Sequence, residues 1–230
     1  MESENLKPVQ WLVSAAPVSH PAAVAFMERR VGEIRQGLSP ETVWFLEHPA
    51  LYTAGTSARA DELLDPHGFP VYETGRGGRY TYHGPGQRVA YVMLDLSRRG
   101  RDLRAYVHDL EGWLIASLGK LGVQAGRRKG RIGIWVDRGG REDKIAALGV
   151  RVRRWVTFHG VSLNVDVDLS HFGGIVPCGI SEHGVTSLKS MGLDTGMDTL
   201  DAALRDTFGD VFGSPLADPV AFDPGQAMGK

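Results

Sequence analysis

The chain has a single cysteine, Cys178, and its surroundings make it a candidate nucleophile. It stands in the run "GGIVPCGIS", where Pro177 and Gly179 favour an irregular turn on which a sulfur atom can be exposed. A thiol with an ordinary pKa is only about 3% thiolate at pH 7, so nucleophilic chemistry at Cys178 requires a neighbouring base or cation. The alternative interpretation is a small, buried apolar residue, which is the usual role of a lone cysteine.

Lys144 is the candidate proton partner. If "DKIAALGV" forms a strand, Lys144 shares one face with Ala146, Leu148 and Val150, and because that face is otherwise apolar the ammonium group points inward. Burial lowers the pKa of a lysine and a nearby thiolate raises it, so in either case this amine can exchange a proton. The alternative is a lysine at a strand end whose amine reaches solvent. Nothing in the sequence separation shows that Lys144 and Cys178 meet.

Two histidines offer a rival base. His83 in "TYHG" and His159 in "TFHG" each follow a threonine and an aromatic residue and precede a glycine, which would let a ligand lie against the backbone. Chance similarity of the two words is the alternative. Neither histidine has another ligand-type residue at a recognised metal spacing. We therefore expect no metal site and no cofactor.

The segment "RGGRYTYHGPGQ", Arg76 to Gln87, contains four glycines. Glycine at this density weakens regular structure, because glycine loses the most backbone freedom on folding. One interpretation is an ordinary turn-rich loop. The other is a backbone that must let another group approach closely.

Composition narrows the class of protein. The 230 residues are 42% hydrophobic and carry a net charge of −1, which suits a domain with a substantial core and argues against a dedicated nucleic-acid binder. One cysteine excludes an intrachain disulfide framework. The first twenty residues lack the basic stretch of a signal peptide, and no apolar run approaches the roughly 18 residues that cross a bilayer. We expect a cytoplasmic protein that binds neither membrane nor nucleic acid.

The hydrophobic periodicity predicts one α/β domain. A helix is expected between the N-cap Ser19 and Gly37, a second after the N-cap Asp102, and a third in "MDTLDAALRDTFGDVFG". Strands are expected at residues 9–15, 42–48 and 88–96 and in the consecutive runs "GRIGIWVD", "DKIAALGVRV" and "WVTFHGVSLNVDV", with a polar loop after His48. Strand–helix alternation breaks down after Gly130, so a mixed, largely antiparallel sheet is favoured over a doubly wound one.

Three sequence segments together resemble the octanoyltransferase family of lipoate biosynthesis: "RGGRYTYHGPGQRVAYVMLDL", "KIAALGVRVRRWVTFHGVSLNV" and "IVPCGI". They occur in that family's order and spacing, and the resemblance runs from about Trp11 to Gly213. It implies a single mixed, largely antiparallel α/β domain of the biotin/lipoate protein ligase type over residues 1–213, followed by a loose tail over 214–230. Ser162 departs from the family, which often has a small apolar residue there.

The resemblance also implies an activity. Members of the family take an octanoyl group from acyl carrier protein and pass it to a lysine on the lipoyl domains of 2-oxoacid dehydrogenases and the glycine cleavage protein. Cys178 then corresponds to the acyl-thioester nucleophile and Lys144 to its proton partner. The acyl-binding segments correspond to Arg76, Gly77, Gly78, Arg79, Tyr80, Thr81, Tyr82 and His83, to Ala147, Leu148 and Gly149, and to His159, Gly160, Val161 and Ser162.

An acidic carrier protein would require a local basic face. The candidates are "GRRKGR", Gly126 to Arg131, and "RVRRW", Arg151 to Trp155, although such runs are usually solvated charges without a partner. Three rival functions remain open: a ligase of the same fold that activates a free acid with ATP, a non-catalytic acyl-binding protein, and a Cys-His hydrolase that releases free octanoate.

Overall fold

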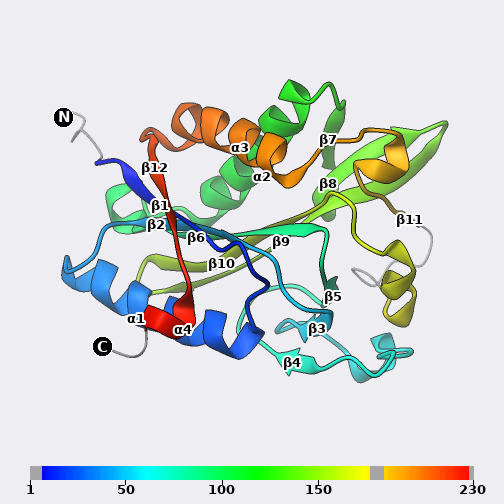
Figure 1. The fold of residues 1–230 in the computed structure, drawn as a ribbon, viewed down its shortest axis with the longest axis horizontal. Coiled ribbons are helices and arrows are strands. Elements are labelled where there is room, and N and C mark those ends of the chain that lie inside the picture. The colour runs from blue at the N-terminus through cyan, green and yellow to red at the C-terminus, as the bar shows by residue number, and fades with distance from the viewer. Residues whose placement is uncertain (1–6, 177–183, 228–230) are drawn as a thin grey trace.

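A computed structural model describes residues 7–176 and 184–227. Its largest feature is a nine-stranded sheet with the order β12-β1-β2-β6-β10-β9-β8-β7, in which β11 also pairs with β9 (Figure 1). The strands of this sheet are β1 (Val9–Val13), β2 (Thr42–Leu46), β6 (Gln87–Met93), β7 (Ala125–Arg128), β8 (Arg131–Arg138), β9 (Arg141–Arg153), β10 (Val156–Asn164), β11 (Gly184–Val185) and β12 (Leu216–Ala221).

The sheet is mixed, as the sequence predicts. β1 is parallel to both β2 and β12, and β11 is parallel to β9. The pairs from β2 through β6, β10, β9 and β8 to β7 are all antiparallel. The prediction of a mixed, largely antiparallel sheet is therefore confirmed.

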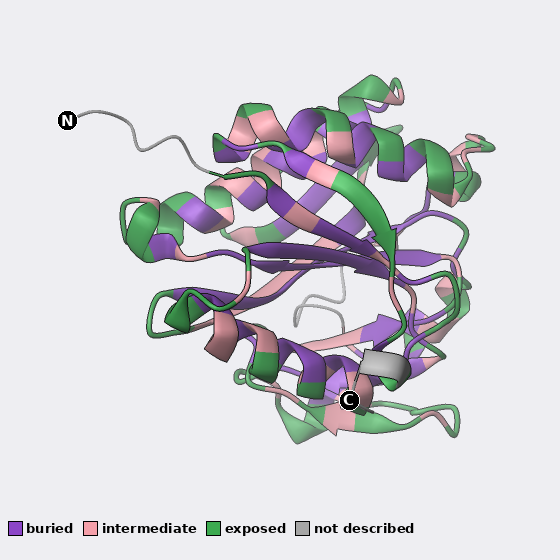
Figure 2. Ribbon diagram, turned by 60° about the vertical axis from the view of Figure 1, so that its left-hand side comes forward, coloured by how far each residue is buried: buried purple, intermediate pink, exposed green. Residues whose placement is uncertain are grey.

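Helices cover both faces of this sheet. Helices α2 (Leu103–Lys120) and α3 (Met197–Phe212) lie on one side and α1 (His20–Gln36) on the other, so the central strands are buried between two layers (Figure 2). Strand β2 shows why: Val43 and Phe45 pack in the core with α2 and α3, while Trp44 and Leu46 pack in the core with α1. A strand that is covered on both faces carries a continuous apolar run, and this is the pattern that made it recognisable.

The predicted helix ends are also confirmed. Ser19 caps α1 through a hydrogen bond that its hydroxyl accepts from Ala22 N, and Gly37 ends the helix with a φ of 72°. Asp102 caps α2 by accepting hydrogen bonds from two backbone N–H groups of the first turn. None of the helices in the described part of the chain is long and apolar enough to cross a bilayer.

The polar loop predicted after His48 is wrong. The chain instead forms a second, three-stranded sheet of β3 (Leu51–Ala54), β4 (Val71–Glu73) and β5 (Tyr80–His83). It is held by a small core of its own, in which Tyr52 and Tyr82 pack with Phe172 and Ile175. These strands have three or four residues each, so the local sequence holds too few apolar positions to reveal an alternating pattern.

The loose tail predicted from residue 214 is wrong as well. Strand β12 pairs with the edge strand β1, and Val9 N donates a hydrogen bond of 2.9 Å to Pro215 O. Beyond this strand the ring of Phe222 packs against Phe26 and Trp44, and α4 (Pro224–Ala227) follows. Pairing with β1 and packing of Phe222 against Phe26 and Trp44 order this segment. All of these partners are remote from it in sequence.

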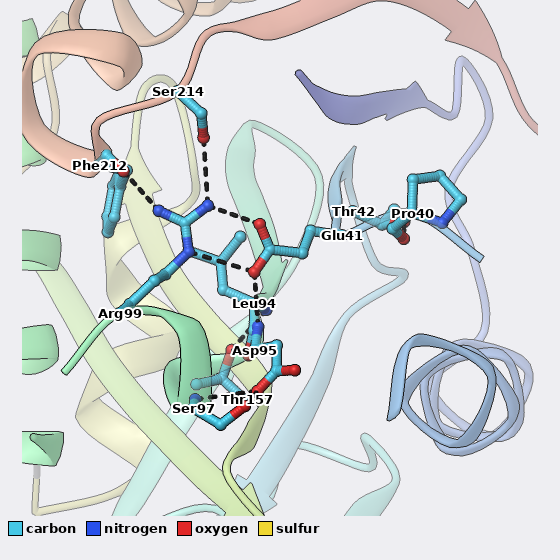
Figure 3. Close-up of polar contacts among 10 residues, drawn as sticks. All are labelled: Pro40, Glu41, Thr42, Leu94, Asp95, Ser97, Arg99, Thr157, Phe212 and Ser214. Carbon is cyan, nitrogen blue, oxygen red and sulfur yellow. Dashed lines mark hydrogen bonds and ion pairs between the residues drawn. The ribbon is translucent and has the colours of Figure 1, made fainter. Parts of the chain in front are cut away.

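A buried ion pair joins the middle of the chain to its C-terminal part. The guanidinium of Arg99 pairs with the carboxylate of Glu41 at 2.5 Å and also donates to Phe212 O and, at 3.1 Å, to Ser214 Oγ (Figure 3). The same carboxylate accepts a hydrogen bond of 2.7 Å from Asp95 N. The cluster therefore fixes the end of α3 and the start of the last strand against β2.

Candidate functional site

The structure contains a cavity of about 310 Å³ that reaches from the glycine-rich segment before β5 to strands β9 and β10. Most of the residues predicted to bind the acyl group line it: residues 76–81, His83, residues 147–149 and residues 159–162. These segments lie far apart in the chain, and the pairing of β9 with β10 brings two of them together because Gly149 is opposite Gly160.

Backbone forms one wall of the cavity. Gly77 N donates a hydrogen bond of 2.9 Å to Val150 O, which holds the segment 76–78 against β9. A Cβ atom at Gly149 would lie 2.8 Å from Arg76 Cδ and 3.2 Å from Gly77 O, so a side chain there would push this segment away. Of the two interpretations of the glycine-rich run, close backbone approach is the one that the structure supports.

Lys144 points into the protein, as predicted from the strand pattern. Lys144 is 6% exposed and lines the cavity, and its Nζ lies 4.8 Å from the centroid of the Trp135 ring. Room for the lysine stem comes from Gly133, which has a φ of 124°. A Cβ atom there would approach Lys144 Cε to 3.0 Å and Ala146 O to 2.9 Å. The position is therefore restricted to glycine by both conformation and space.

The predicted nucleophile, Cys178, lies outside the described residues. On one side the described chain ends at Val176, whose N–H donates to Glu62 O at 2.8 Å. On the other side it resumes in β11, where Val185 pairs with Lys144 itself. Contact between Cys178 and Lys144 stays a prediction.

The segments "TYHG" and "TFHG" both contribute to the same cavity. His83 and His159 both line it, and they are linked through two residues that the sequence did not single out. The ring of His48 lies 5.7 Å from that of His83, His48 Nε2 and the Tyr91 hydroxyl are 2.7 Å apart, and the Tyr91 ring lies 5.9 Å from that of His159. His159 also adopts a φ of 59°, in the left-handed region that non-glycine residues rarely occupy.

These histidines are neutral at pH 7. Burial, with a smaller contribution from the positive charge of Arg76, lowers the pKa of His159 to about 3 and that of His20 to about 4. Burial also lowers the pKa of His83 well below its ordinary value. Arg76 is itself buried and donates hydrogen bonds to Thr53 O at 2.7 Å and to Arg79 O at 2.9 Å. The site therefore combines a fixed positive charge with uncharged imidazoles.

The hydrogen-bond network assigns the tautomer of His83. Asn164 Nδ2 donates to Thr186 O, so its Oδ1 accepts from Gln87 Nε2, each at 2.9 Å. Gln87 Oε1 then faces His83 Nδ1 at 2.6 Å, which places the imidazole proton on Nδ1 and leaves a lone pair on Nε2. Because the pKa of His83 is so low, this lone pair is a hydrogen-bond acceptor and a weak base.

One predicted binding residue, Tyr82, lies elsewhere. Its ring packs in the small core against Tyr52 and Phe172, and its hydroxyl is 2.9 Å from His171 Nδ1. Successive residues of a strand point to opposite sides, and in β5 it is Thr81 and His83 that face the cavity while Tyr82 faces the core.

Residues to which the sequence pattern gave no role also line the cavity. His20, Tyr91, Gln87 and Asn164 belong to it. Gln87 and Asn164 stood inside the quoted words and were not assigned a role, whereas His20 carries no local signal because it reads as the first residue of a helix. Within residues 7–176 and 184–227, no group of three His, Cys, Asp or Glu side chains is arranged to hold a metal ion.

Comparison with known sequences identifies relatives along almost the whole chain. The family described as the lipoyl protein ligase A/B catalytic domain matches residues 20–209. An octanoyltransferase of Paramagnetospirillum magneticum is 67% identical over 208 residues, which cover 90% of this chain and 98% of the relative. An octanoyltransferase of Caulobacter vibrioides is 59% identical over 225 residues, covering 96% and 99%.

Solved structures share the fold at low sequence identity. A lipoate-protein ligase A bound with ATP has a TM-score of 0.73 at 16% identity, covering 96% of this chain and 92% of that one. A bipartite lipoate protein ligase from Thermoplasma acidophilum has a TM-score of 0.70 at 16% identity, covering 96% and 90%. The predicted ligase-type fold is therefore confirmed.

Proposed function

The chain belongs to the lipoyl protein ligase A/B catalytic domain family, among its octanoyltransferases, and from this premise we propose that it moves an octanoyl group between two proteins through Cys178. The donor is the octanoyl thioester of acyl carrier protein. The acceptor is the amine of one lysine on a lipoyl domain of a 2-oxoacid dehydrogenase or of the glycine cleavage protein, which makes this the first step of endogenous lipoylation. The observation that carries the proposal is a buried lysine, Lys144, in the wall of a largely apolar cavity.

In the first half-reaction Lys144, as the neutral amine, takes the proton of the Cys178 thiol. The thiolate attacks the donor carbonyl, a new carbon–sulfur bond forms to Cys178, and the bond to the carrier sulfur breaks. The Lys144 ammonium returns its proton to the leaving carrier thiolate. Exchange of one thioester for another is nearly even in free energy, so an octanoyl-enzyme can accumulate.

In the second half-reaction the acceptor lysine first gives up one proton to solvent, and its neutral amine attacks the octanoyl thioester while Lys144 takes a second proton from the attacking nitrogen. An amide bond forms, the bond to Cys178 Sγ breaks, and the departing thiolate recovers the proton from Lys144. Because an amide is more stable than a thioester, the transfer needs no nucleotide. The covalent intermediate divides one difficult transfer into two steps and predicts ping-pong kinetics.

The cavity supports the choice of acyl chain. Ala147, Leu148 and Val161 contribute apolar surface from β9 and β10, and Gly77 and Gly78 contribute bare backbone on the other wall. Burying an alkyl chain gives about 0.8 kcal/mol per methylene, so the six methylenes of octanoyl contribute roughly 5 kcal/mol before entropy losses. That term favours eight carbons over much shorter acids.

An ATP-dependent ligase is the second candidate, because the solved structures that share the fold include a ligase bound with ATP. A ligase forms an acyl-adenylate and has no use for a nucleophilic sulfur, so the presence of Cys178 favours transfer from a thioester. Octanoylation of a lipoyl domain from octanoyl-carrier protein in the absence of ATP decides between them. A strict requirement for ATP and free octanoate would establish the ligase instead.

The direct test is intact-mass measurement after incubation with octanoyl-carrier protein alone. The wild-type protein is expected to gain one octanoyl group that hydroxylamine removes, and Cys178→Ala is expected to gain none. Peptide mapping of the wild-type adduct must place it on Cys178. A Cys178→Ala protein that still gains a stable adduct and still octanoylates the lipoyl domain would refute the proposal.

A further inference from the structure

Exposed arginines lie on two segments of the chain that meet beside the turn between β9 and β10. We call this region the arginine surface and define it as Arg98, Arg101, Arg104, Arg153 and Arg154, together with the half-exposed ring of Trp155. Three of the five arginines lie between residues 98 and 104, around the start of α2, whereas Arg153 ends β9 and Arg154 lies in the turn. The sequence alone predicted only the second group as part of a basic face.

Backbone contacts join the two groups into one surface. Leu96 N donates a hydrogen bond of 2.7 Å to Trp155 O, and Arg101 N donates to Leu96 O at 2.8 Å. The guanidinium of Arg101 then lies 6.0 Å from the centroid of the Trp155 ring, within reach of a cation–π contact. The turn itself is well defined, with Arg154 and Trp155 both at positive φ. These contacts fix the backbone that carries the arginine surface.

The other basic run, Gly126 to Arg131, differs because acidic side chains already neutralise much of its charge. Arg127 pairs with Glu111 at 2.9 Å, and Arg128 and Arg131 both pair with Glu142. By contrast, none of the five arginines of the arginine surface forms an ion pair with a carboxylate in the described part of the chain. The two acids beside them serve as caps: Asp95 accepts from Ser97 N and Asp102 from Arg104 N.

The arginine surface adjoins the open side of the cavity. Leu103 lies between Arg101 and Arg104 and is 43% exposed, yet it also lines the cavity, as does Val107 one turn further along α2. A residue that is both exposed and part of the cavity wall marks a place where the cavity meets solvent. A partner bound to these arginines would therefore sit beside an entrance to the proposed acyl site.

We propose that the arginine surface is the docking site of the acidic acyl-carrier protein. This inference rests on the proposed function, because it names the place where the donor of that reaction binds. Complementary charge chiefly accelerates encounter and selects the partner, and exposed arginines around one aromatic ring are residues that protein interfaces favour. A nucleic acid is the weaker alternative, since the whole chain carries a net charge of −1.

The test compares two double variants with the same change in net charge. Arg104→Glu/Arg153→Glu reverses two charges of the arginine surface at positions with ordinary backbone conformations. Arg35→Glu/Lys129→Glu reverses two exposed charges at the end of α1 and in the β7–β8 turn, and Lys129 also lies in the other basic run. Each protein is assayed with octanoyl-carrier protein and with the uncharged octanoyl thioester of N-acetylcysteamine. The neutral variant Arg104→Gln/Arg153→Gln gives an intermediate point.

The arginine-surface variant is expected to raise KM for the carrier roughly fivefold to tenfold at low salt, with kcat and the small-thioester reaction unchanged. The difference from wild type is expected to shrink at physiological ionic strength, where the Debye length is about 8 Å. The control variant is expected to behave as wild type.

Other outcomes overturn the inference, and they differ from failure of the proposed function. An unchanged KM for the carrier in Arg104→Glu/Arg153→Glu, with transfer intact, would show that the carrier docks elsewhere. The same unchanged KM together with weakened binding to a generic DNA or RNA duplex would assign the surface to a nucleic acid. If the wild-type protein transferred octanoyl from neither donor, the proposed reaction itself would be refuted.

Discussion

The structure contains two buried polar regions that accommodate the positive charge of an arginine in different ways. In the cluster of Figure 3, opposite charges meet: Arg99 and Glu41 are each less than a tenth exposed and neutralise one another. In the cavity wall, the hydrogen bonds of Arg76 to described residues go to uncharged oxygens, and the nearby histidines are kept uncharged by burial. In the first region the two charged groups are already paired with each other. The second leaves imidazole and amine groups facing a space that a substrate can enter.

Both regions are buried, but their different contacts indicate different roles: one in stability and the other in turnover. Breaking a buried ion pair leaves an uncompensated charge and costs stability, whereas removing a proton-transfer group from a cavity costs rate. If the two regions are as distinct as their contacts indicate, a substitution in one should change the free energy of unfolding and a substitution in the other should change turnover.

The largest effect is expected for Lys144→Ala. Loss of the proposed proton partner should lower kcat for transfer by roughly 10²–10⁴-fold, the usual contribution of general acid–base catalysis, and should slow alkylation of Cys178 by iodoacetamide at neutral pH. Lys144→Arg separates charge from proton transfer, because arginine keeps the cation and cannot give up its proton. Lys120→Ala, at an exposed ion pair with Asp206, is the control. An alkylation rate of Lys144→Ala that equals wild type between pH 6.5 and 8.5 would remove the lysine from the mechanism.

Glu41→Ala tests the opposite region. It should lower the free energy of unfolding by about 3–5 kcal/mol, because the buried guanidinium of Arg99 loses its carboxylate, while kcat of the folded protein stays at the wild-type value. Urea denaturation measures the first quantity and steady-state transfer the second. The double variant Glu41→Leu/Arg99→Leu should recover part of the loss, since it removes both charges together. A clear fall in kcat of the folded Glu41→Ala protein would contradict the division between the regions.

The buried histidines in and beside the cavity predict a dependence of stability on pH. His48 donates from Nδ1 to Val18 O at 2.6 Å and accepts from the Tyr91 hydroxyl, and burial lowers its pKa to about 4 from an ordinary value of 6.5. The unfolded chain therefore binds the proton first as the pH falls, and stability is lost between about pH 6.5 and pH 4. His48 alone should cost about 2 kcal/mol between pH 7 and pH 5.

The measurement is urea unfolding at pH 7, 6 and 5. His48→Gln should lower stability at pH 7 through its lost contacts and make the decline toward pH 5 less steep. The remaining decline belongs to His20, His83 and His159, whose pKa values are lowered in the same direction. His108→Gln, at an exposed position of α2, is the control. A decline in His48→Gln that is as steep as in wild type would show that His48 titrates alike in both states.

The sequence predicts the parts of this molecule that carry their own pattern. Strand β6 is buried along its whole length and has a continuous apolar run, and α2 has both an apolar stripe and its cap Asp102. The inward direction of Lys144 followed from alternation in one strand. What could not be predicted depends on contacts between remote segments: β12 becomes a strand because β1 offers an edge, and β5 because β3 does. The link between His83 and His159 likewise requires Tyr91 from a third strand.

The smallest effect is expected for Tyr82→Phe, which tests the one predicted binding residue that lies outside the cavity. Its hydroxyl lies 2.9 Å from His171 Nδ1 in the small core, so its loss should lower the free energy of unfolding by about 1 kcal/mol. Transfer and the preference for eight carbons over six or ten should match wild type, because the cavity wall is formed by Thr81 and His83 on the other side of the strand. Thr81→Val, which alters that wall, is the comparison and is expected to change the KM for the donor while leaving stability within about 0.5 kcal/mol. If Tyr82→Phe shifts the chain-length preference and Thr81→Val does not, then Tyr82 rather than its neighbour contacts the acyl chain, and the orientation of β5 assigned to this site is wrong.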